Sequence, residues 1–195
     1  FIRTILLTFS FLWFTYLASK IGEEYIAANA ILINLVFLSA FILDAYAFST
    51  EGIVGFAIGR RNKTSFLSVV KNSIQLSFFT ALIISIFYLI FFKQIINIIT
   101  DIDILRFISY KHAIWIIIIP PVASFCYQLD GIFIGASQTQ DMRNAMIVAV
   151  VFFIFISTYL TKYFGNHGLW LSLLLFTLLR SITLNYFFNK ILKKF

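Results

Sequence analysis

The chain has 195 residues, of which 61% are hydrophobic and 19% aromatic, whereas only 12% are charged, and its net charge is +7. Soluble globular domains are usually about 45–50% apolar and about 25% charged, so this composition excludes an ordinary soluble domain and indicates an integral membrane protein. The positive net charge then points to membrane topology rather than to nucleic-acid binding, because basic residues collect in cytoplasmic loops.

Hydropathy predicts six membrane-spanning segments, since each span needs about 20 apolar residues to cross a hydrocarbon core about 30 Å thick. The apolar runs are long and unbroken, whereas the strands of a membrane barrel would alternate over about 10 residues, so we predict an all-α, polytopic helix bundle. In chain order the predicted spans cover residues 4–19, 26–59, 73–92, 112–137, 145–164 and 168–189.

The beginning of the chain suggests a partial sequence. The first predicted span is short, and the first residue is Phe1 rather than Met, so we expect the sequence to start partway into a larger protein. A cleaved signal peptide is the alternative interpretation of residues 1–20, because Arg3 precedes an apolar stretch and Ala18 and Ser19 are small.

The loops predict the orientation. Six antiparallel crossings place both ends of the chain and the loops at 60–72 and 138–144 on one side of the membrane. That side holds Arg3, Arg60, Arg61, Lys63, Lys71, Arg143, Lys190, Lys193 and Lys194. The other side holds Lys20, Lys93, Arg106, Lys111 and Lys162, diluted by Glu23, Glu24, Asp101 and Asp103. The first side is therefore predicted to be cytoplasmic, in a multi-pass protein of the inner (plasma) membrane.

Residues 93–111, between the third and fourth predicted spans, are amphipathic. They are expected either to lie along the outer membrane interface or to form a plain loop.

Two acidic residues lie deep inside the second predicted span. At about 1.5 Å rise per residue, Glu51 lies roughly 13 Å and Asp44 roughly 24 Å along the helix from Arg60. Ionised carboxylates at such depth cost at least a few kcal/mol, so they nearly always face a protein interior or a wet cavity. Because the two acids are seven residues apart, they share one helix face, which also carries Phe37, Ala40, Phe41, Ala47, Phe48 and Gly55. In the alternative interpretation the two acids only bond to neighbouring helices.

A second deep acid, Asp130, follows the same pattern in the fourth predicted span. It lies roughly 20 Å from Arg143 by the same helical rise, and Leu129-Asp130 repeats Leu43-Asp44. Because the second and fourth spans run in the same direction, the two helices are predicted to present acids at comparable depth. Candidate residues for a substrate cavity around these acids are Phe37, Phe41, Phe48, Tyr127, Gln128 and Phe133.

Three other features bear on such a cavity. Pro120 and Pro121 remove helical hydrogen bonds, so they predict either an interrupted helix that builds a midplane binding site or a simple packing kink.

Arg180, in the last span, either pairs with one of the acids as a counter-ion or snorkels to the cytoplasmic side. Four amides within the predicted spans are expected to bond between helices, although two of them could face the cavity instead. These amides are Asn29, Asn34, Gln75 and Gln128, of which Asn34 and Gln128 are the two cavity candidates.

The sequence shows no motif for enzyme chemistry. It contains no nucleotide-binding loop, no nucleophile elbow and no paired histidines at metal spacing, so we predict neither an enzyme nor a cofactor or metal site. His112 and His167 stand at span ends and are expected to be interfacial. Residues 166–168 are expected to form the external turn between the last two spans.

Three segments, taken together and in order, resemble one transporter family. They are LDAYAFSTEGIVGFAIGRRNK (43–63), QLDGIFIGASQTQDMRNAM (128–146) and NHGLWLSLLLFTLLRSITL (166–184). The chain resembles the C-terminal half of a multidrug and toxic compound extrusion (MATE) transporter, most similar to the bacterial DinF-like branch, over essentially its whole length.

The resemblance implies a clamshell of two six-helix lobes, of which residues 1–195 would be the second, with the N-terminal lobe absent. It also implies export of lipophilic cationic or toxic compounds by antiport with protons or sodium. Asp130 falls where sodium-coupled members carry an acid in the tenth helix, and Asp44 and Glu51 match the DinF-branch pattern in the eighth. The first span lacks the glutamate of the sodium-coupled branch, which favours protons.

The expected mechanism is competition between two ligands for one site. A proton and a small cationic substrate would compete for the same carboxylates, and the aromatic rings would add cation–π attraction. One rival function is that of a lipid-linked precursor flippase of the same superfamily, which would line its cavity with more basic residues. The sequence also leaves open an intramembrane enzyme and a purely structural membrane subunit.

Overall fold

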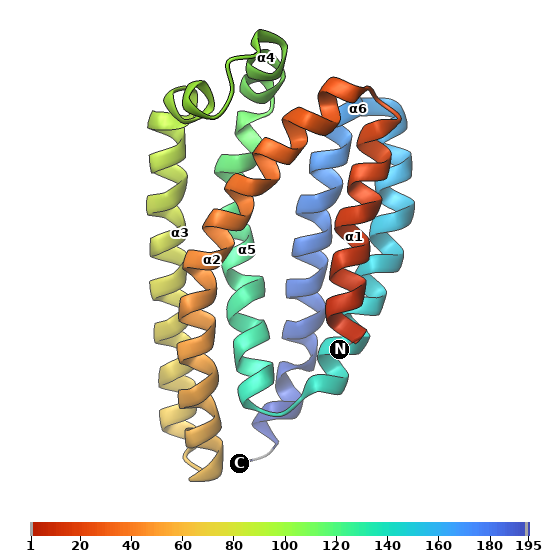
Figure 1. Ribbon diagram of the computed structural model, residues 1–195. Helices are drawn as coiled ribbons and strands as arrows, with labels where there is room; N and C mark the ends of the chain where they lie inside the picture. Colours follow the sequence, from red (N-terminus) through yellow and green to blue (C-terminus); the bar gives the residue numbers. More distant parts are fainter. Residues whose placement is uncertain (1, 194) are drawn as a thin grey trace.

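The computed structural model describes residues 2–193 and 195, which form six helices and no strand. Phe1 and Lys194, the latter counted above among the cytoplasmic basic residues, lie outside the described residues. The helices, in chain order, are α1 (Ile2–Ser19), α2 (Glu23–Gly59), α3 (Lys63–Ile99), α4 (Asp103–Lys111), α5 (Ala113–Gly135) and α6 (Thr139–Leu192). This arrangement confirms the all-α bundle (Figure 1).

Five of these helices are long and apolar enough to cross a membrane, and α6 contains two crossings. Its backbone leaves helical geometry at Gly165, with φ 56° and ψ −137°, a conformation that glycine adopts with little strain. The chain reverses there, so residues 139–164 and 166–192 run as two antiparallel arms (Figure 1). The external turn predicted at 166–168 therefore lies one residue earlier.

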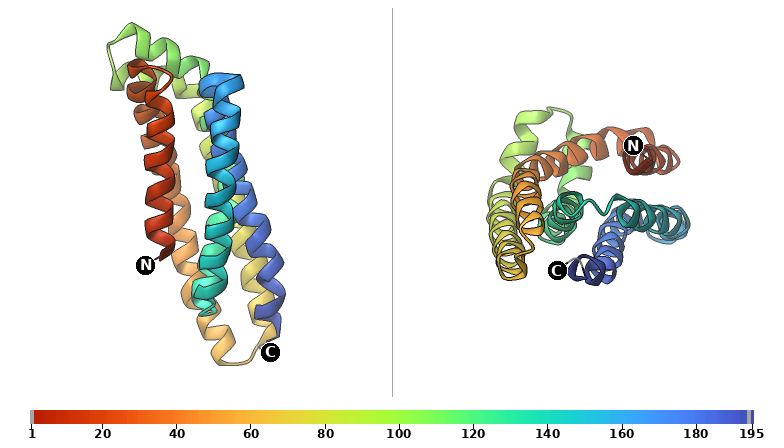
Figure 2. Two further views of the ribbon diagram at one scale, coloured as in Figure 1. Left: turned by 90° about the vertical axis from the view of Figure 1, so that its right-hand side faces the viewer. Right: turned by 90° about the horizontal axis from the view of Figure 1, so that it is seen from below.

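The two ends of the bundle match the predicted antiparallel order. The short connections at 60–62 and 136–138 lie at the same end as the C-terminus, and α4 and the α6 reversal lie at the other end (Figure 1). Seen along the bundle, α3 lies beside α2 and α5, while α1 lies beside α6 (Figure 2). The end of the bundle with the connections at 60–62 and 136–138 and the C-terminus is called the inner end below, and the end with α4 and the α6 reversal is called the outer end.

The segment at 93–111 is largely helical rather than a plain loop. The third helix continues to Ile99, and α4 follows after a short connection. One face of α4 buries Leu105 and Ile108 against Ala28 of α2, whereas Phe107 on the opposite face is 66% exposed. The short helix therefore caps α2 with its apolar face.

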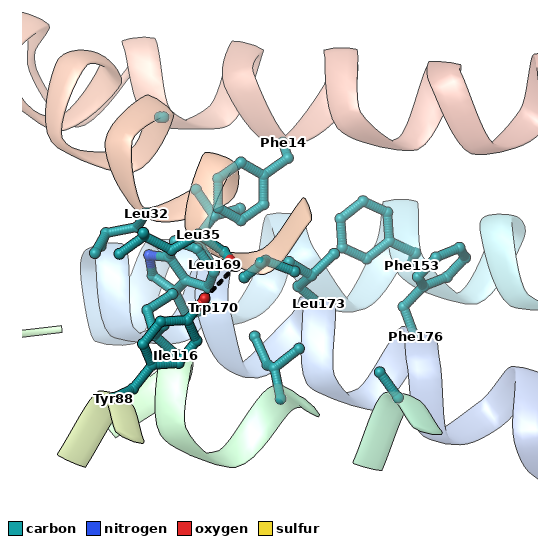
Figure 3. Close-up of a cluster of buried hydrophobic side chains, with 14 of the residues drawn as sticks. Phe14, Leu32, Leu35, Tyr88, Ile116, Phe153, Leu169, Trp170, Leu173 and Phe176 are labelled. Atoms are coloured by element: carbon teal, nitrogen blue, oxygen red, sulfur yellow. Dashed lines mark hydrogen bonds between the residues drawn. The ribbon is translucent and has the colours of Figure 1, made fainter. Parts of the chain in front are cut away.

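The main core lies between α1, α2, α3, α5 and both arms of α6 (Figure 3). Trp170 is completely buried, and the ring of Phe14 meets its ring edge-on with 5.2 Å between the ring centroids. The indole Nε1 of Trp170 donates a hydrogen bond to Asn29 Oδ1 at 2.9 Å. Asn29 and Asn166 also exchange two hydrogen bonds, at 2.7 and 3.0 Å. Such polar contacts hold helices together in lipid, which confirms the interhelical role expected of Asn29.

The helices α2 and α5 touch backbone to backbone at the depth of the acids. A Cβ atom added at Gly131 would collide with the carbonyl oxygen of Ala47, and one at Gly135 would collide with that of Glu51. Small residues four apart allow this close approach. The contact brings the acidic face of α2 beside Asp130.

The proline pair does not interrupt α5, which is continuous from Ala113 to Gly135, so of the two alternatives the interrupted helix is excluded. Pro121 has no N–H to donate to the carbonyl of Ile117 four residues earlier. The hydroxyl of Ser85 on α3 donates to that carbonyl instead, at 2.7 Å. A neighbouring helix thus supplies the hydrogen bond that the proline removes, which is how proline is tolerated inside membrane helices.

Candidate functional site: a charged cavity between four helices

A cavity of about 260 Å³ lies between α1, α2, α5 and the second arm of α6. Its lining contains five charged side chains, which are Arg3, Asp44, Glu51, Asp130 and Arg180. All three acids predicted from the sequence therefore lie around one cavity. Their part in ion or proton coupling is taken up as a proposal below.

Four of the predicted aromatic residues also line this cavity. Phe37 and Tyr127 are half-buried, whereas Phe41 and Phe48 are 72% and 70% exposed and stand on the open side. Aromatic faces beside carboxylates suit a cation with an apolar body.

Gln128 and Phe133 do not line the cavity, which corrects the expectation from the sequence. A helix turns about 100° per residue, so Gln128, two residues before Asp130, points to the opposite side of α5. It is completely buried there, and its Oε1 accepts a hydrogen bond from Thr50 Oγ1 at 3.0 Å. Phe133 is completely buried in a second apolar cluster nearer the inner end.

Arg180 pairs with Asp130 and does not snorkel. Its Nη2 donates to Asp130 Oδ2 at 2.7 Å, and the two residues are only 5% and 7% exposed. The guanidinium also lies over the ring of Phe176, 5.7 Å from its centroid. Of the two roles that the sequence left open for Arg180, the structure selects the counter-ion.

Arg3 is a cavity residue that the sequence reasoning assigned only to the cytoplasmic side. Its Nη2 lies 3.7 Å from the same Asp130 Oδ2. A signal for this was available in the sequence spacing, because Arg3 lies 16 residues before the end of α1 at Ser19, about 24 Å by the helical rise. The antiparallel α2 starts at Glu23 and measures about 55 Å, so Arg3 is level with the middle of α2.

The charges in the cavity are unevenly paired. Both guanidiniums face one carboxylate, Asp130. Asp44 and Glu51 are half-buried, and neither makes a hydrogen bond or an ion pair with any residue that the structure describes. The acids of α2 are therefore the ones available to a ligand.

His112 and His167 lie at helix ends, as expected from the sequence, and their rings contact each other. Their rings stack at 4.2 Å at the outer end, and His112 is only 2% exposed. His112 Nδ1 donates to the carbonyl of Ile108 at 2.7 Å, and Trp115 Nε1 donates to His167 Nδ1 at 3.1 Å. Burial lowers the pKa of His112 to about 4, and His167 and Lys111 act in the same direction. No cluster of three or more metal-ligating side chains occurs among residues 2–193 and 195.

Comparison with known proteins agrees with the helical membrane fold described above. The MatE family model matches residues 1–160. The chain is 37% identical, over 184 residues, to the DNA damage-inducible protein F of Escherichia coli, which covers 94% of this chain and 40% of that protein. It is 24% identical to Protein DETOXIFICATION 43 of Arabidopsis thaliana, over 93% of this chain and 34% of that protein. The chain thus spans less than half the length of these relatives.

Solved structures share the fold at low sequence identity. A structure described as the inward-facing conformation of a multidrug resistance MATE family transporter matches with a TM-score of 0.90 at 15% identity, over 99% of this chain and 46% of that one. The outward-facing conformation of such a transporter matches with a TM-score of 0.87 at 15% identity, over 98% and 44%. A transporter of the MOP superfamily from Pyrococcus furiosus matches with a TM-score of 0.85 at 20% identity, over 96% and 42%.

The family model covers most of the chain, and the helices and the fold agree with it. This chain is a multi-pass membrane protein that belongs to the MatE family, the multidrug and toxic compound extrusion transporters, which are transporters and not enzymes.

Proposed function

We propose that residues 1–195 are the C-terminal six-helix lobe of a two-lobe antiporter that exports lipophilic cationic or toxic compounds in exchange for protons, with sodium as the alternative ion. The N-terminal lobe would complete the cavity. The chain spans 40% of its relative from Escherichia coli, as expected of one lobe. The protein would lie in the inner membrane with the inner end of this lobe in the cytoplasm.

One observation carries this proposal. The cavity presents the carboxylates of Asp44 and Glu51, which pair with none of the described residues, beside the exposed rings of Phe41 and Phe48. A lipophilic cation gains from both groups, and a proton competes with it for the carboxylates. Exchange of one for the other across the membrane is antiport.

The similarity to two solved conformations supports a moving lobe. The same fold matches an inward-facing and an outward-facing transporter with TM-scores of 0.90 and 0.87. Interfaces and packed cores are bistable rather than continuously deformable, so alternating access is expected from rocking of one whole lobe against the other.

A lipid-linked precursor flippase is the second candidate, and Arg3 and Arg180 are the observation that favours it. Two guanidiniums in a cavity suit a phosphate. The Pyrococcus furiosus structure is described as having a binding pocket of reverse polarity that suggests a different function for that protein. Here, however, both guanidiniums already face Asp130, so cation export remains the better supported function.

The test uses the full-length two-lobe protein in proteoliposomes. Efflux of a fluorescent lipophilic cation is driven by an imposed pH gradient and, separately, by an imposed sodium gradient. Wild type is compared with Asp44→Asn and with Glu24→Gln, an exposed acid outside the cavity. We expect proton-driven efflux that Asp44→Asn abolishes and Glu24→Gln preserves. Absence of wild-type efflux under both gradients would overturn the proposal and turn the test to lipid-linked substrates.

A further inference from the structure

The two deepest acids of the cavity have different surroundings. Asp130 Oδ2 lies 2.7 Å from Arg180 Nη2 and 3.7 Å from Arg3 Nη2, and the side chains of Asp130 and Arg180 are 10% and 6% exposed. One carboxylate oxygen therefore faces two guanidiniums in a nearly closed space. A buried charge that loses its partner is strongly destabilising.

Asp44 lines the same cavity from the opposite helix, without a hydrogen bond or an ion pair to the residues that the structure describes. The close backbone contact of Gly131 with Ala47 brings the two helices together just beside it. Asp44 consequently interacts electrostatically with Asp130, Arg3 and Arg180 without being bonded to any of them.

We propose that Asp44 is the carboxylate that exchanges a proton for the cationic substrate, and that Asp130 is a positioning residue which holds Arg180 away from Asp44. The inference rests on the proposed antiport. A proton or a cation that bound Asp130 would have to displace Arg180 and leave its guanidinium buried without an acceptor. Asp44 can bind and release either ligand without breaking any contact.

The pairing makes a specific prediction about a double variant. In Asp130→Asn the guanidinium of Arg180 loses its acceptor, and Asp44 is the acid left to neutralise it. Exchange is then lost although Asp44 is intact. In Asp130→Asn/Arg180→Gln both charges of the pair are removed, the net charge of the cluster with Arg3 is unchanged, and no Arg180 guanidinium remains for Asp44 to neutralise. Exchange should return.

The experiment measures efflux of a fluorescent lipophilic cation in proteoliposomes over a range of pH, with the full-length protein. The gradient-driven efflux rate should fall at least about tenfold in Asp44→Asn and in Asp130→Asn. In the double variant the rate should return to within about threefold of wild type. A recovery of this size lies within the range of interaction energies measured between contacting residues. The double variant should also share the pH profile of wild type. Asp130→Asn should be inactive although it is still folded, which separates positioning from a purely structural role, because loss of a structural pair would act through unfolding.

Three results would overturn the inference. These are a folded double variant that stays inactive, efflux that survives in Asp44→Asn, and a recovered rate with an altered pH profile. If the amide pair does not fold, Asp130→Leu/Arg180→Met carries the same test, because apolar residues of similar volume often replace a buried ion pair without loss of stability. Absence of efflux in wild type itself would instead overturn the antiport, and the inference with it.

Discussion

The hydroxyl of Ser85 lies 2.7 Å from the carbonyl oxygen of Ile117, the one backbone acceptor of α5 that Pro121 leaves without its helical donor. A hydrogen bond from α3 therefore compensates for a proline in α5. In lipid no water is available to do so, and an unpaired carbonyl is costly.

Replacing Ser85 by alanine should accordingly lower the free energy of unfolding by about 1–2 kcal/mol, because the Ile117 carbonyl loses its donor. Reversible unfolding in mixed micelles measures this change. In a Pro121→Ala background the helix supplies its own N–H, so Ser85→Ala should then cost much less. Equal costs in both backgrounds would show that Ser85 acts through packing alone.

The contact between α2 and α5 predicts different outcomes for two helical glycines. In Gly131→Ala the new methyl group meets the backbone of Ala47, which should destabilise the lobe by about 1–3 kcal/mol through overpacking. Gly52 has open space around its Cβ position, so Gly52→Ala should stabilise the helix by about 0.5–1 kcal/mol. The same unfolding assay compares the two variants, and a neutral Gly131→Ala would contradict the close approach.

The histidine stack predicts a loss of stability in acid. Burial lowers the pKa of His112 from its ordinary value of 6.5 to about 4, so between these values the unfolded chain binds a proton that the folded chain does not. Stability should therefore fall as the pH drops from about 6.5 to about 4. Thermal unfolding in detergent at a series of pH values measures the slope. His112→Phe keeps a ring against His167 and should reduce it, whereas an unchanged slope would assign the acid sensitivity to other groups.

The exposed aromatic residues of the cavity predict a change in affinity. Phe48→Ala in the full-length protein should weaken binding of a lipophilic cation by about two- to tenfold, and Phe48→Tyr should retain it, because the ring face provides the attraction. Fluorescence titration of a cationic dye measures both. Phe79, which is 62% exposed on α3 and does not line the cavity, supplies the control Phe79→Ala. Equal weakening in Phe79→Ala would indicate nonspecific partition into apolar surface.

Some of this protein could be read directly from residue order. Long apolar runs predict membrane helices because each helix satisfies its own backbone hydrogen bonds in lipid, whatever its neighbours are. The helical repeat likewise places Asp44 and Glu51 on one face, since that relation depends on one helix only. The prediction of long apolar helices and the shared face therefore needed no knowledge of packing.

Other features depend on which helices are neighbours and how far each is shifted along the bundle. Arg3 reaches Asp130 because it lies level with the middle of α2, and Arg180 pairs with Asp130 rather than snorkelling because that acid lies within its reach. The hydrogen bond from Thr50 to Gln128 and the compensation of Pro121 by Ser85 likewise follow from the sides on which α2 and α3 approach α5. These relations join residues from separate helices, so tertiary packing alone decided which acid of the cavity is paired and which is free.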